Sequence, residues 1–528
     1  MKWFARLRER EPALLTALAL SIALATAAFF LQGHLDINLQ DEGFLWYGAV
    51  HTHAGDVPMH DFRAYDPGRY YWCAAWAVLL GDGLLALRAS CWIFAAVGLC
   101  FGLLAASRAT RNVLLLAAVG VTFVLWMFPP WKLFECGIAL VASYFAVILV
   151  EKPNVARHVL AGVVTGLAAF FGRNHGLYLA VSFAALIVFL WWKHGRPERT
   201  PGASSLGLVR RAGAWTLGIV IGYAPMLALM LFVDGFTKTF VDSILFYTRQ
   251  SSLNVPLAVV WPWIPEYSKL VPLHAVSAFS LGSLFLLVPA VYVIAWIVSL
   301  RSSASSLPAR ALLVGSVFVG TTYVHHASVR SDVYHLAQAI HPWLLCLLAV
   351  CAAAWSTRAR WLGATALAIV LAFSVLSVGL MQPWQRKRFA EGTPDAYVPC
   401  DVRGDTFVVE PRDALLVRAI SQLVTNNVRA ADDVWLSAKL ISLYPILGRR
   451  SPIWDIYPAW EANDSDQERM TRELAAVEWI VLLDEPIGGA KGVRFPALFP
   501  KVWERVNVDF ERVQTPFKGP LYFMRRRR

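Results

Sequence analysis

The sequence predicts an all-α polytopic membrane protein with a small α/β domain at its C-terminal end, and three observations lead to this fold class. Hydrophobic residues make up 57% of the 528 residues and charged residues only 16%, whereas soluble domains are about 45–50% apolar and about 25% charged. The apolar residues gather in runs that are long enough to cross a bilayer. From residue 383 onward these runs stop and the chain becomes rich in charge.

About eleven runs have near-spanning length and are predicted to be transmembrane helices. They lie at residues 12–32, 84–106, 112–129, 133–150, 156–172, 175–192, 212–233, 275–299, 310–326, 336–355 and 361–381. The first run follows four basic residues, but it is about 20 residues long and has no convincing cleavage site, so it is expected to be retained as a span. A further run, Tyr70–Leu80, is too short to cross and carries tyrosine and tryptophan, so it is expected to lie in the membrane interface.

The basic residues indicate how the chain is oriented. A net charge of +12 would suggest nucleic acid as the partner of a soluble protein, but here the Lys and Arg residues stand between apolar spans, so no nucleic-acid partner is expected. They concentrate in the loops on the side of the N-terminus, which the positive-inside rule places in the cytoplasm. An odd number of spans then places residues 383–528 outside.

Two domains are expected from this organisation. Residues 1–382 form the transmembrane domain, including a first outer loop at 33–83, and residues 383–528 form the outer domain. Within the outer domain, helical patterns near 411–429 and 464–476 alternate with short β-rich runs at 406–409, 434–436 and 479–483, which is typical of an α/β fold. Of the seven cysteines, only Cys400 lies clearly outside the apolar stretches, so no disulfide framework is predicted.

The first outer loop is the first candidate for chemistry, because it is long and dense in acidic and histidine side chains. Asp41 and Glu42 are adjacent and are followed by Gly43 and an apolar run. This places a carboxylate pair at the start of a helix that dips towards the membrane, which favours a general base. The alternative is a solvated loop in which these acids only cap a helix.

Two other outer turns carry charge at the membrane edge. One contains Arg173 and His175, and the other contains Arg330, Asp332, Tyr334 and His335. Ionisable groups near a membrane are costly unless they are paired, so they often mark function. The alternatives are that an ion pair between Arg330 and Asp332 only pins its loop, and that Arg173 only extends to the interface.

Ten of the twelve histidines lie at or near the outer side. A metal site, for example through His51 and His53 with nearby carboxylates, would explain this clustering. However, no spacing matches a strong zinc signature such as two histidines four positions apart beside a glutamate. Histidines that contact a phosphate explain the pattern equally well, and we expect no metal cofactor.

At this point the residues resemble a known family. The first outer loop resembles that of bacterial GT-C-type glycosyltransferases, the relatives of aminoarabinose and protein-mannosyl transferases. The positions that carry the resemblance are Asp41-Glu42-Gly43, Tyr47, Gly55, Pro58, Asp61-Phe62, Pro67-Gly68 and Tyr70-Tyr71. The turn Arg330-Ser331-Asp332 with His335 also resembles a motif in bacterial members, and the layout of spans, acidic outer loop and outer C-terminal domain is similar.

The resemblance implies an integral-membrane glycosyltransferase that acts at the periplasmic face of the bacterial inner membrane. Its donor would be a polyprenyl-phosphate-linked sugar, and its acceptor an unidentified envelope lipid, glycan or protein. Asp41 matches the acidic residue that acts as base or orients the acceptor, with Glu42 beside it. Candidates for binding the donor phosphate are Arg330, His335, Arg173 and His175, and supporting residues are Asp332, Tyr334, Tyr47 and Asp61.

Three other interpretations of the sequence stay open. One is a sensor whose C-terminal α/β domain binds a ligand and whose membrane part anchors it, although eleven spans are excessive for an anchor. An O-antigen polymerase or ligase also joins lipid-linked sugars outside, but such proteins usually place their large loop late in the chain. A lipid or sugar transporter would favour spans broken by Gly or Pro and charges at mid-membrane, which are sparse here.

Overall fold

The computed structural model describes residues 2–194, 207–249, 257–301, 309–355, 360–379, 396–437, 439–486, 493–515 and 520–528. The chain forms two compact units. The helical unit comprises Met1–Leu31, Cys91–Leu229 and Pro256–Arg386, and the mixed unit comprises Gln32–Ser90, Met230–Val255 and Lys387–Arg528.

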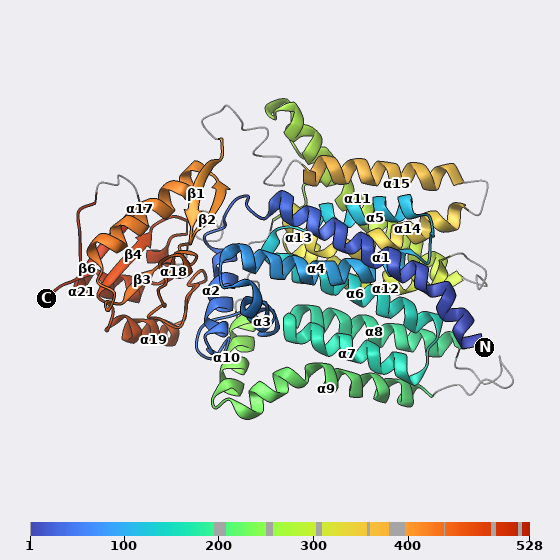
Figure 1. Cartoon of the computed structure of the whole chain (residues 1–528), viewed down its shortest axis with the longest axis horizontal. Helices are drawn as coiled ribbons and strands as arrows, with labels where there is room; N and C mark the ends of the chain where they lie inside the picture. Colours follow the sequence, from blue (N-terminus) through green and yellow to red (C-terminus); the bar gives the residue numbers. More distant parts are fainter. Residues whose placement is uncertain are drawn as a thin grey trace. The chain divides into compact units, whose positions relative to one another are not determined.

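The helical unit contains the long apolar helices (Figure 1). They are α1 (Lys2–Gln32), α4 (Leu84–Ala106), α5 (Val113–Leu125), α6 (Leu133–Glu151), α7 (Val155–Phe171), α8 (Arg173–His194), α9 (Leu208–Phe232), α11 (Pro272–Arg301), α12 (Arg310–Val329), α13 (Val333–Ala339), α14 (His341–Trp355) and α15 (Arg360–Ser374), of which α1, α4 and α9 end or begin in the mixed unit. Short helical turns lie at η1 (Pro130–Lys132), η3 (Tyr267–Lys269) and η4 (Val375–Gly379). Helix α12 packs against α6, α8 and α14 and so lies at the centre of this unit.

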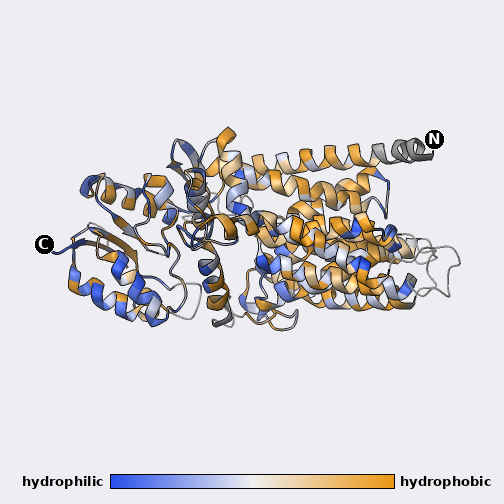
Figure 2. Ribbon diagram, turned by 90° about the horizontal axis from the view of Figure 1, so that it is seen from below, coloured by the Kyte–Doolittle hydropathy of each residue, from blue (hydrophilic) through white to orange (hydrophobic). Residues whose placement is uncertain are grey.

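Each predicted membrane span contains a helix in its described part, which confirms the polytopic fold class. Residues 380 and 381 of the last predicted span lie outside the described residues. Among the described residues, eight helices are long and apolar enough to cross a membrane, or nine if α13 and α14, bent by 62°, count as one span. The runs at 112–129 and 156–172 form the shorter helices α5 and α7. Pro129 and Pro130 follow α5, and Pro342 stands in the first turn of α14. Proline lacks the N–H that would continue a preceding helix, so these residues explain why the helices end or break there. Figure 2 shows the long hydrophobic stretches of these helices.

Glycines allow two of these helices to pack backbone to backbone. Gly162 and Gly166 on α7 meet Gly218 and Gly222 on α9. A Cβ atom on Gly162 would lie 2.0 Å from the carbonyl oxygen of Trp215, and one on Gly222 would lie 2.2 Å from that of Val163. Small residues four positions apart are typical of close helix pairs in membranes.

The mixed unit combines helices and strands. Its helices are α2 (Asp41–His53), α3 (Gly68–Leu80), α10 (Phe236–Arg249), α17 (Pro411–Asn427), α18 (Leu443–Leu447), α19 (Asp464–Leu474), α20 (Phe495–Leu498) and α21 (Pro500–Asp509). Its strands are β1 (Val398–Val402), β2 (Asp405–Val409), β3 (Val434–Leu436), β4 (Trp479–Leu483), β5 (Phe510–Arg512) and β6 (Leu521–Arg526). The helices and strands predicted for the C-terminal region are therefore confirmed, and the apolar run at 70–80 is helical as α3.

Four strands form one sheet in the order β3-β4-β6-β5, in which β3 and β4 are parallel and the other neighbours are antiparallel. Strands β1 and β2 form a separate hairpin whose turn, Arg403-Gly404, has positive φ at both residues, as two-residue hairpins favour. The segment before α2 adds to this hairpin, since the amide of Asp36 donates to the carbonyl of Val408 and the amide of Val408 donates to that of His34.

The compact mixed unit thus joins the first outer loop to residues of the C-terminal region. The sequence predicts that residues 1–382 form a transmembrane catalytic domain and that residues 383–528 form a domain outside the membrane. This division stays a prediction. Neither the helices α10, α18, α20 and α21 nor the strands β1, β5 and β6 were expected. Short or amphipathic elements of this kind have little apolar periodicity of their own.

Candidate functional site

Asp41 is the first residue of α2, and the local sequence explains why the helix begins there. The side-chain oxygen of Asn38 accepts hydrogen bonds from the amides of Gln40 and Asp41, at 3.1 and 2.6 Å. These bonds satisfy amides that have no partner inside the helix. The positive end of the helix dipole also favours a carboxylate at this position. The structure therefore places Asp41 where its charge is stabilised.

A tyrosine from the C-terminal region engages the Asp41 carboxylate. The hydroxyl of Tyr457 donates to Oδ1 of Asp41 at 2.7 Å and accepts from Nε2 of Gln40 at 2.8 Å. Burial, together with the charge of Asp41, raises the pKa of Tyr457 well above its usual range, so the phenol stays protonated and acts as donor. The other carboxylate oxygen of Asp41, Oδ2, has no hydrogen-bond partner in the part of the chain that the structure describes.

Packing fixes the ring of Tyr457. Its ring centroid lies 5.1 Å from that of Phe44 and 5.2 Å from that of Trp460. Just before it in the chain, Asp455 accepts from the amide of Tyr457 at 3.1 Å and forms an ion pair with Arg63 at 2.7 Å. Arg63 belongs to the first outer loop, so that loop and the segment around Tyr457 are held together inside the mixed unit.

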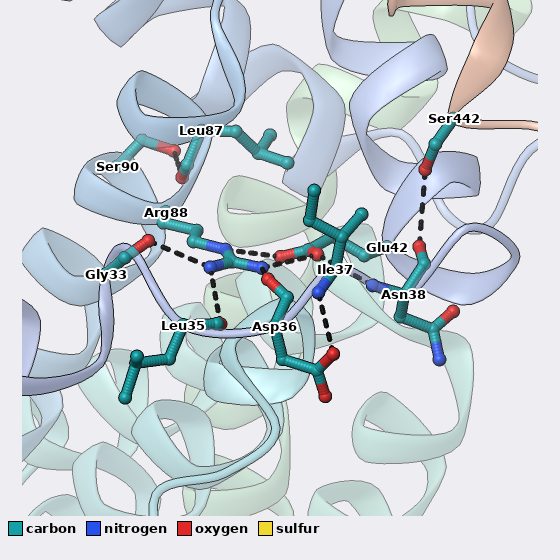
Figure 3. Close-up of polar contacts among 10 residues, drawn as sticks. All are labelled: Gly33, Leu35, Asp36, Ile37, Asn38, Glu42, Leu87, Arg88, Ser90 and Ser442. Atoms are coloured by element: carbon teal, nitrogen blue, oxygen red, sulfur yellow. Dashed lines mark hydrogen bonds and ion pairs between the residues drawn. The ribbon is translucent and has the colours of Figure 1, made fainter. Parts of the chain in front are cut away.

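Glu42 has a different environment from its neighbour Asp41. It is 0% exposed and pairs with Arg88, which is 2% exposed. The guanidinium donates to both carboxylate oxygens at 2.7 Å, from Nε to Oε1 and from Nη2 to Oε2 (Figure 3). Oε2 also accepts from the amide of Asn38 at 3.3 Å. Glu42 is thus a buried, fully engaged carboxylate.

Two supporting residues proposed from the sequence lie in the same unit. Tyr47 is buried, its hydroxyl accepts from the amide of Ser451 at 3.2 Å, and burial raises its pKa to about 12. Asp61 accepts from the amide of Val57 at 2.7 Å and pairs with His60 at 2.8 Å. Tyr47 therefore links α2 to the C-terminal region, whereas Asp61 holds a turn of the first outer loop.

Arg330, Asp332 and His335 form a second cluster, in the helical unit. Asp332 is the N-cap of α13, and its Oδ1 accepts from the amide of His335 at 2.8 Å. The same oxygen lies 2.9 Å from Nδ1 of His335, and Oδ2 accepts from Nε of Arg330 at 2.6 Å. Burial alone would raise the pKa of Asp332, but the hydrogen bonds from His335 and the charges of His335 and Arg330 lower it.

This arrangement orients two cationic side chains with one carboxylate. Nη1 and Nη2 of Arg330, and Nε2 of His335, have no hydrogen-bond partner among the residues that the structure describes. Arg330 is about a third exposed, at 32% of its side chain. A planar fork with two unused NH₂ groups suits bidentate binding of a phosphate.

The remaining histidines of this cluster form a row with His335, in which His175 is buried and His326 is half-buried. The ring of His326 lies 5.6 Å from that of His335 and 6.0 Å from that of His175. His326 is hydrogen-bonded to Gln338 at 3.1 Å, and Nδ1 of His175 is 2.9 Å from the hydroxyl of Tyr323. His335 and His175, two of the four residues proposed from the sequence for the donor phosphate, thus lie on either side of His326.

Arg173 and Tyr334 are close in sequence to His175 and His335, respectively. Arg173 is the first residue of α8 and is half-buried. Tyr334 is exposed, and its ring packs 5.6 Å from that of Phe128. Glu135, buried in the first turn of α6, lies close enough to interact electrostatically with His326.

No group of three or more His, Cys, Asp or Glu side chains within the described ranges has an arrangement that could hold a metal ion. A shallow depression of about 480 Å³ lies between α19 and α21, and it is lined by none of the candidate residues.

Sequence reasoning missed Tyr457 and Arg88. Arg88 had a signal, since it is a charged residue inside the apolar run 84–106, and such residues are costly unless paired. Tyr457 had none, because it lies 416 positions from Asp41 in a segment without regular periodicity.

No protein-family model and no curated protein matches the sequence. Among solved structures, the chain is similar to ArnT from Cupriavidus metallidurans in the apo state, with 13% identity and a TM-score of 0.49 over 96% of this chain and 97% of that chain. It is similar to ArnT from the same organism bound to undecaprenyl phosphate, with 13% identity and a TM-score of 0.48 over the same shares. ArnT is an aminoarabinose transferase, a GT-C glycosyltransferase.

Proposed function

We propose that this chain is an integral-membrane glycosyltransferase of GT-C type that acts at the periplasmic face of a bacterial inner membrane. It moves a sugar from a polyprenyl-phosphate donor to an envelope lipid, glycan or protein acceptor. The observation that carries the proposal is the half-engaged carboxylate of Asp41. One oxygen accepts from Tyr457 at 2.7 Å, while the other has no partner among the described residues. An oriented carboxylate with one free oxygen suits a general base.

In the proposed reaction, Oδ2 of Asp41 takes the proton of the acceptor hydroxyl as the acceptor oxygen bonds to C1 of the sugar. The bond between C1 and the phosphate oxygen breaks, and the polyprenyl phosphate leaves with one more negative charge than it carried in the donor. Arg330 and His335 are assigned to that phosphate, because charge-assisted hydrogen bonds stabilise charge that develops in the transition state. Asp332 orients both of them.

The structure favours a supporting role for Glu42, since Arg88 occupies both of its oxygens. We assign no metal to the reaction. The residues proposed for it are a carboxylate base and a cationic phosphate site, which together account for the proton and for the charge of the leaving group.

The test measures release of undecaprenyl phosphate from a panel of synthetic undecaprenyl-phosphate sugars by the purified protein, with envelope lipids as acceptors. Asp41→Asn keeps the size of the side chain and removes its charge, so it should lower turnover by about 10²–10⁴-fold. Asp56→Asn is the matched control, because Asp56 is a carboxylate of the same loop that pairs with His51 and Arg450. If Asp41→Asn lowers turnover less than tenfold, Asp41 is not the base and only stabilises the start of α2.

A further inference from the structure

We propose that Arg88 is a positioning residue for Asp41, acting through Glu42 and through the backbone segment that precedes α2. The inference rests on the proposed function, because it takes Asp41 as the base. Arg88 does not contact Asp41 itself. It binds the residue that follows Asp41 and three residues that lie just before the helix.

All five N–H groups of the guanidinium have an acceptor. Nε and Nη2 donate to the two oxygens of Glu42 at 2.7 Å. Nη2 also donates to the carbonyl of Asp36 at 2.7 Å, and Nη1 donates to those of Gly33 at 2.8 Å and Leu35 at 2.9 Å. Figure 3 shows the guanidinium between these carbonyls and the Glu42 carboxylate. Arg88 is therefore saturated, and it has no donor left for a substrate.

The carbonyls that Arg88 binds belong to a segment with an unusual backbone. Asp36 has a φ of 57°, in the left-handed region that non-glycine residues seldom adopt. Its amide donates to the carbonyl of Val408 on β2, and the ring of Phe407 on that strand lies 5.3 Å from the guanidinium carbon of Arg88. Arg88 thus fixes the segment from one side while β2 fixes it from the other.

This fixed segment leads directly to Asp41. Asn38 follows it, and the side chain of Asn38 binds the amide of Asp41 at 2.6 Å. The amide of Asn38 in turn donates to Oε2 of Glu42, the oxygen that Nη2 of Arg88 also binds. The start of α2 is therefore held on both sides of Asp41 by groups that Arg88 organises. A shift of about 1 Å in a reacting group can lower a rate by about 100-fold.

A lysine at position 88 would not reproduce this arrangement. Lysine keeps the charge, but it has three donors around a single nitrogen, whereas arginine presents five in a planar fork. At least two of the five acceptors would then lose their partner. Arg88→Lys separates the geometry of the fork from its charge.

The experiment measures hydrogen exchange and turnover on the same purified full-length protein. In Arg88→Lys, the amides of residues 33–47 should exchange about tenfold faster or more, since buried hydrogen bonds that restrain the segment are lost. Turnover of the undecaprenyl-phosphate sugar panel should fall about 100-fold in kcat, with KM changed less than about threefold, because the substrate contacts are intact. Glu42→Gln serves as the second variant, since it keeps the shape of the side chain and weakens the same pair.

Arg526→Lys is the matched control. Arg526 also binds backbone carbonyls of the mixed unit, those of Val477 and Leu474, but it has no contact with the segment before α2. It should leave both exchange at 33–47 and kcat unchanged. Unchanged exchange at 33–47 in Arg88→Lys and Glu42→Gln overturns the inference, and so does faster exchange with wild-type kcat. If the wild-type protein releases no undecaprenyl phosphate from any sugar in the panel, the proposed function is contradicted instead. Arg88 would then have no catalytic group to position.

Discussion

The hydroxyl of Tyr457 donates a hydrogen bond of 2.7 Å to Oδ1 of Asp41, and the two residues are 416 positions apart in the chain. The C-terminal region is therefore part of the candidate site, since it supplies a group that contacts the proposed base. Gln40 completes the arrangement by donating to the same phenol oxygen. The phenol has one proton, so the bond from Gln40 directs that proton towards Asp41.

Tyr457→Phe should lower turnover while leaving the fold intact. The variant removes a hydrogen bond to a charged group, which is worth about 1.5–3 kcal/mol, or roughly 10–100-fold in rate. The measurement is kcat for release of undecaprenyl phosphate, together with the melting temperature. Tyr522→Phe is the control, because Tyr522 reaches Asp484 only at 3.4 Å and lies on β6. Equal kcat for the Tyr457 variant and wild type would reduce Tyr457 to a packing residue.

Arg330→Lys should weaken binding of undecaprenyl phosphate. Lysine keeps the charge but loses the planar fork whose NH₂ groups are unused among the described residues. We expect a loss of about 1.5–3 kcal/mol in binding free energy, measured by titration of the purified protein with undecaprenyl phosphate. Arg108→Lys is the control, because Arg108 pairs with Glu151 elsewhere in the helical unit. Normal affinity with a lower melting temperature would show that Arg330 only pins its loop to Asp332.

The helices could be predicted from sequence because burial in a membrane leaves a pattern in consecutive residues. A run such as 84–106 must be apolar to cross, and proline at 129, 130 and 342 marks where helices end or bend. Strands at 434–436 and 479–483 were also predictable, because both are short apolar runs that are fully buried in the sheet.

The contacts of the candidate site could be predicted only in part. Asp332 and His335 are three positions apart, so helical geometry brings them together and the sequence indicates the cluster. The partners of Asp41 and Glu42 come from distant segments, through Tyr457 and Arg88. Such pairings depend on how loops fold back on one another, and one sequence contains no periodic signal for that.

The sidedness of the chain is a separate prediction, carried by the Lys and Arg residues of the loops. If the N-terminus is cytoplasmic and residues 383–528 are periplasmic, a C-terminal alkaline phosphatase fusion should be active and a C-terminal green fluorescent protein fusion should be dark. The reverse pattern would place Asp41 and Arg330 on the cytoplasmic side and contradict the proposed periplasmic reaction.

Gly222→Val should destabilise the helical unit. A Cβ atom at this position would lie 2.2 Å from the carbonyl oxygen of Val163, so α7 and α9 would have to separate. Overpacking of this kind costs about 1–3 kcal/mol, which should appear as a lower melting temperature in detergent. Gly213→Val on the same helix is the matched control, because a Cβ atom there meets nothing within 4 Å. Equal melting temperatures for the two variants would contradict the close packing of α7 and α9.

Asp413→Asn should stabilise the protein at neutral pH and leave it unchanged near pH 4. Burial, followed by the negative charges of Asp36, Glu410 and Glu485, raises the pKa of Asp413 to about 6, whereas an unfolded chain holds it at about 3.9. The unfolded state therefore binds fewer protons between these values, and stability falls as the pH rises from about 4 to about 6.

Asparagine cannot ionise, so this loss of stability should be absent from the variant. Because Asp413 is only half-buried, solvent screens the repulsion, and we expect a gain of about 1 kcal/mol at pH 7. The measurement is the melting temperature of wild type and variant at pH 4, 5, 6 and 7. Asp466→Asn is the control, because Asp466 also lies in the first turn of a helix but pairs with Arg469. A difference that stays constant from pH 4 to pH 7 would show that the carboxylates around Asp413 do not interact in the folded protein.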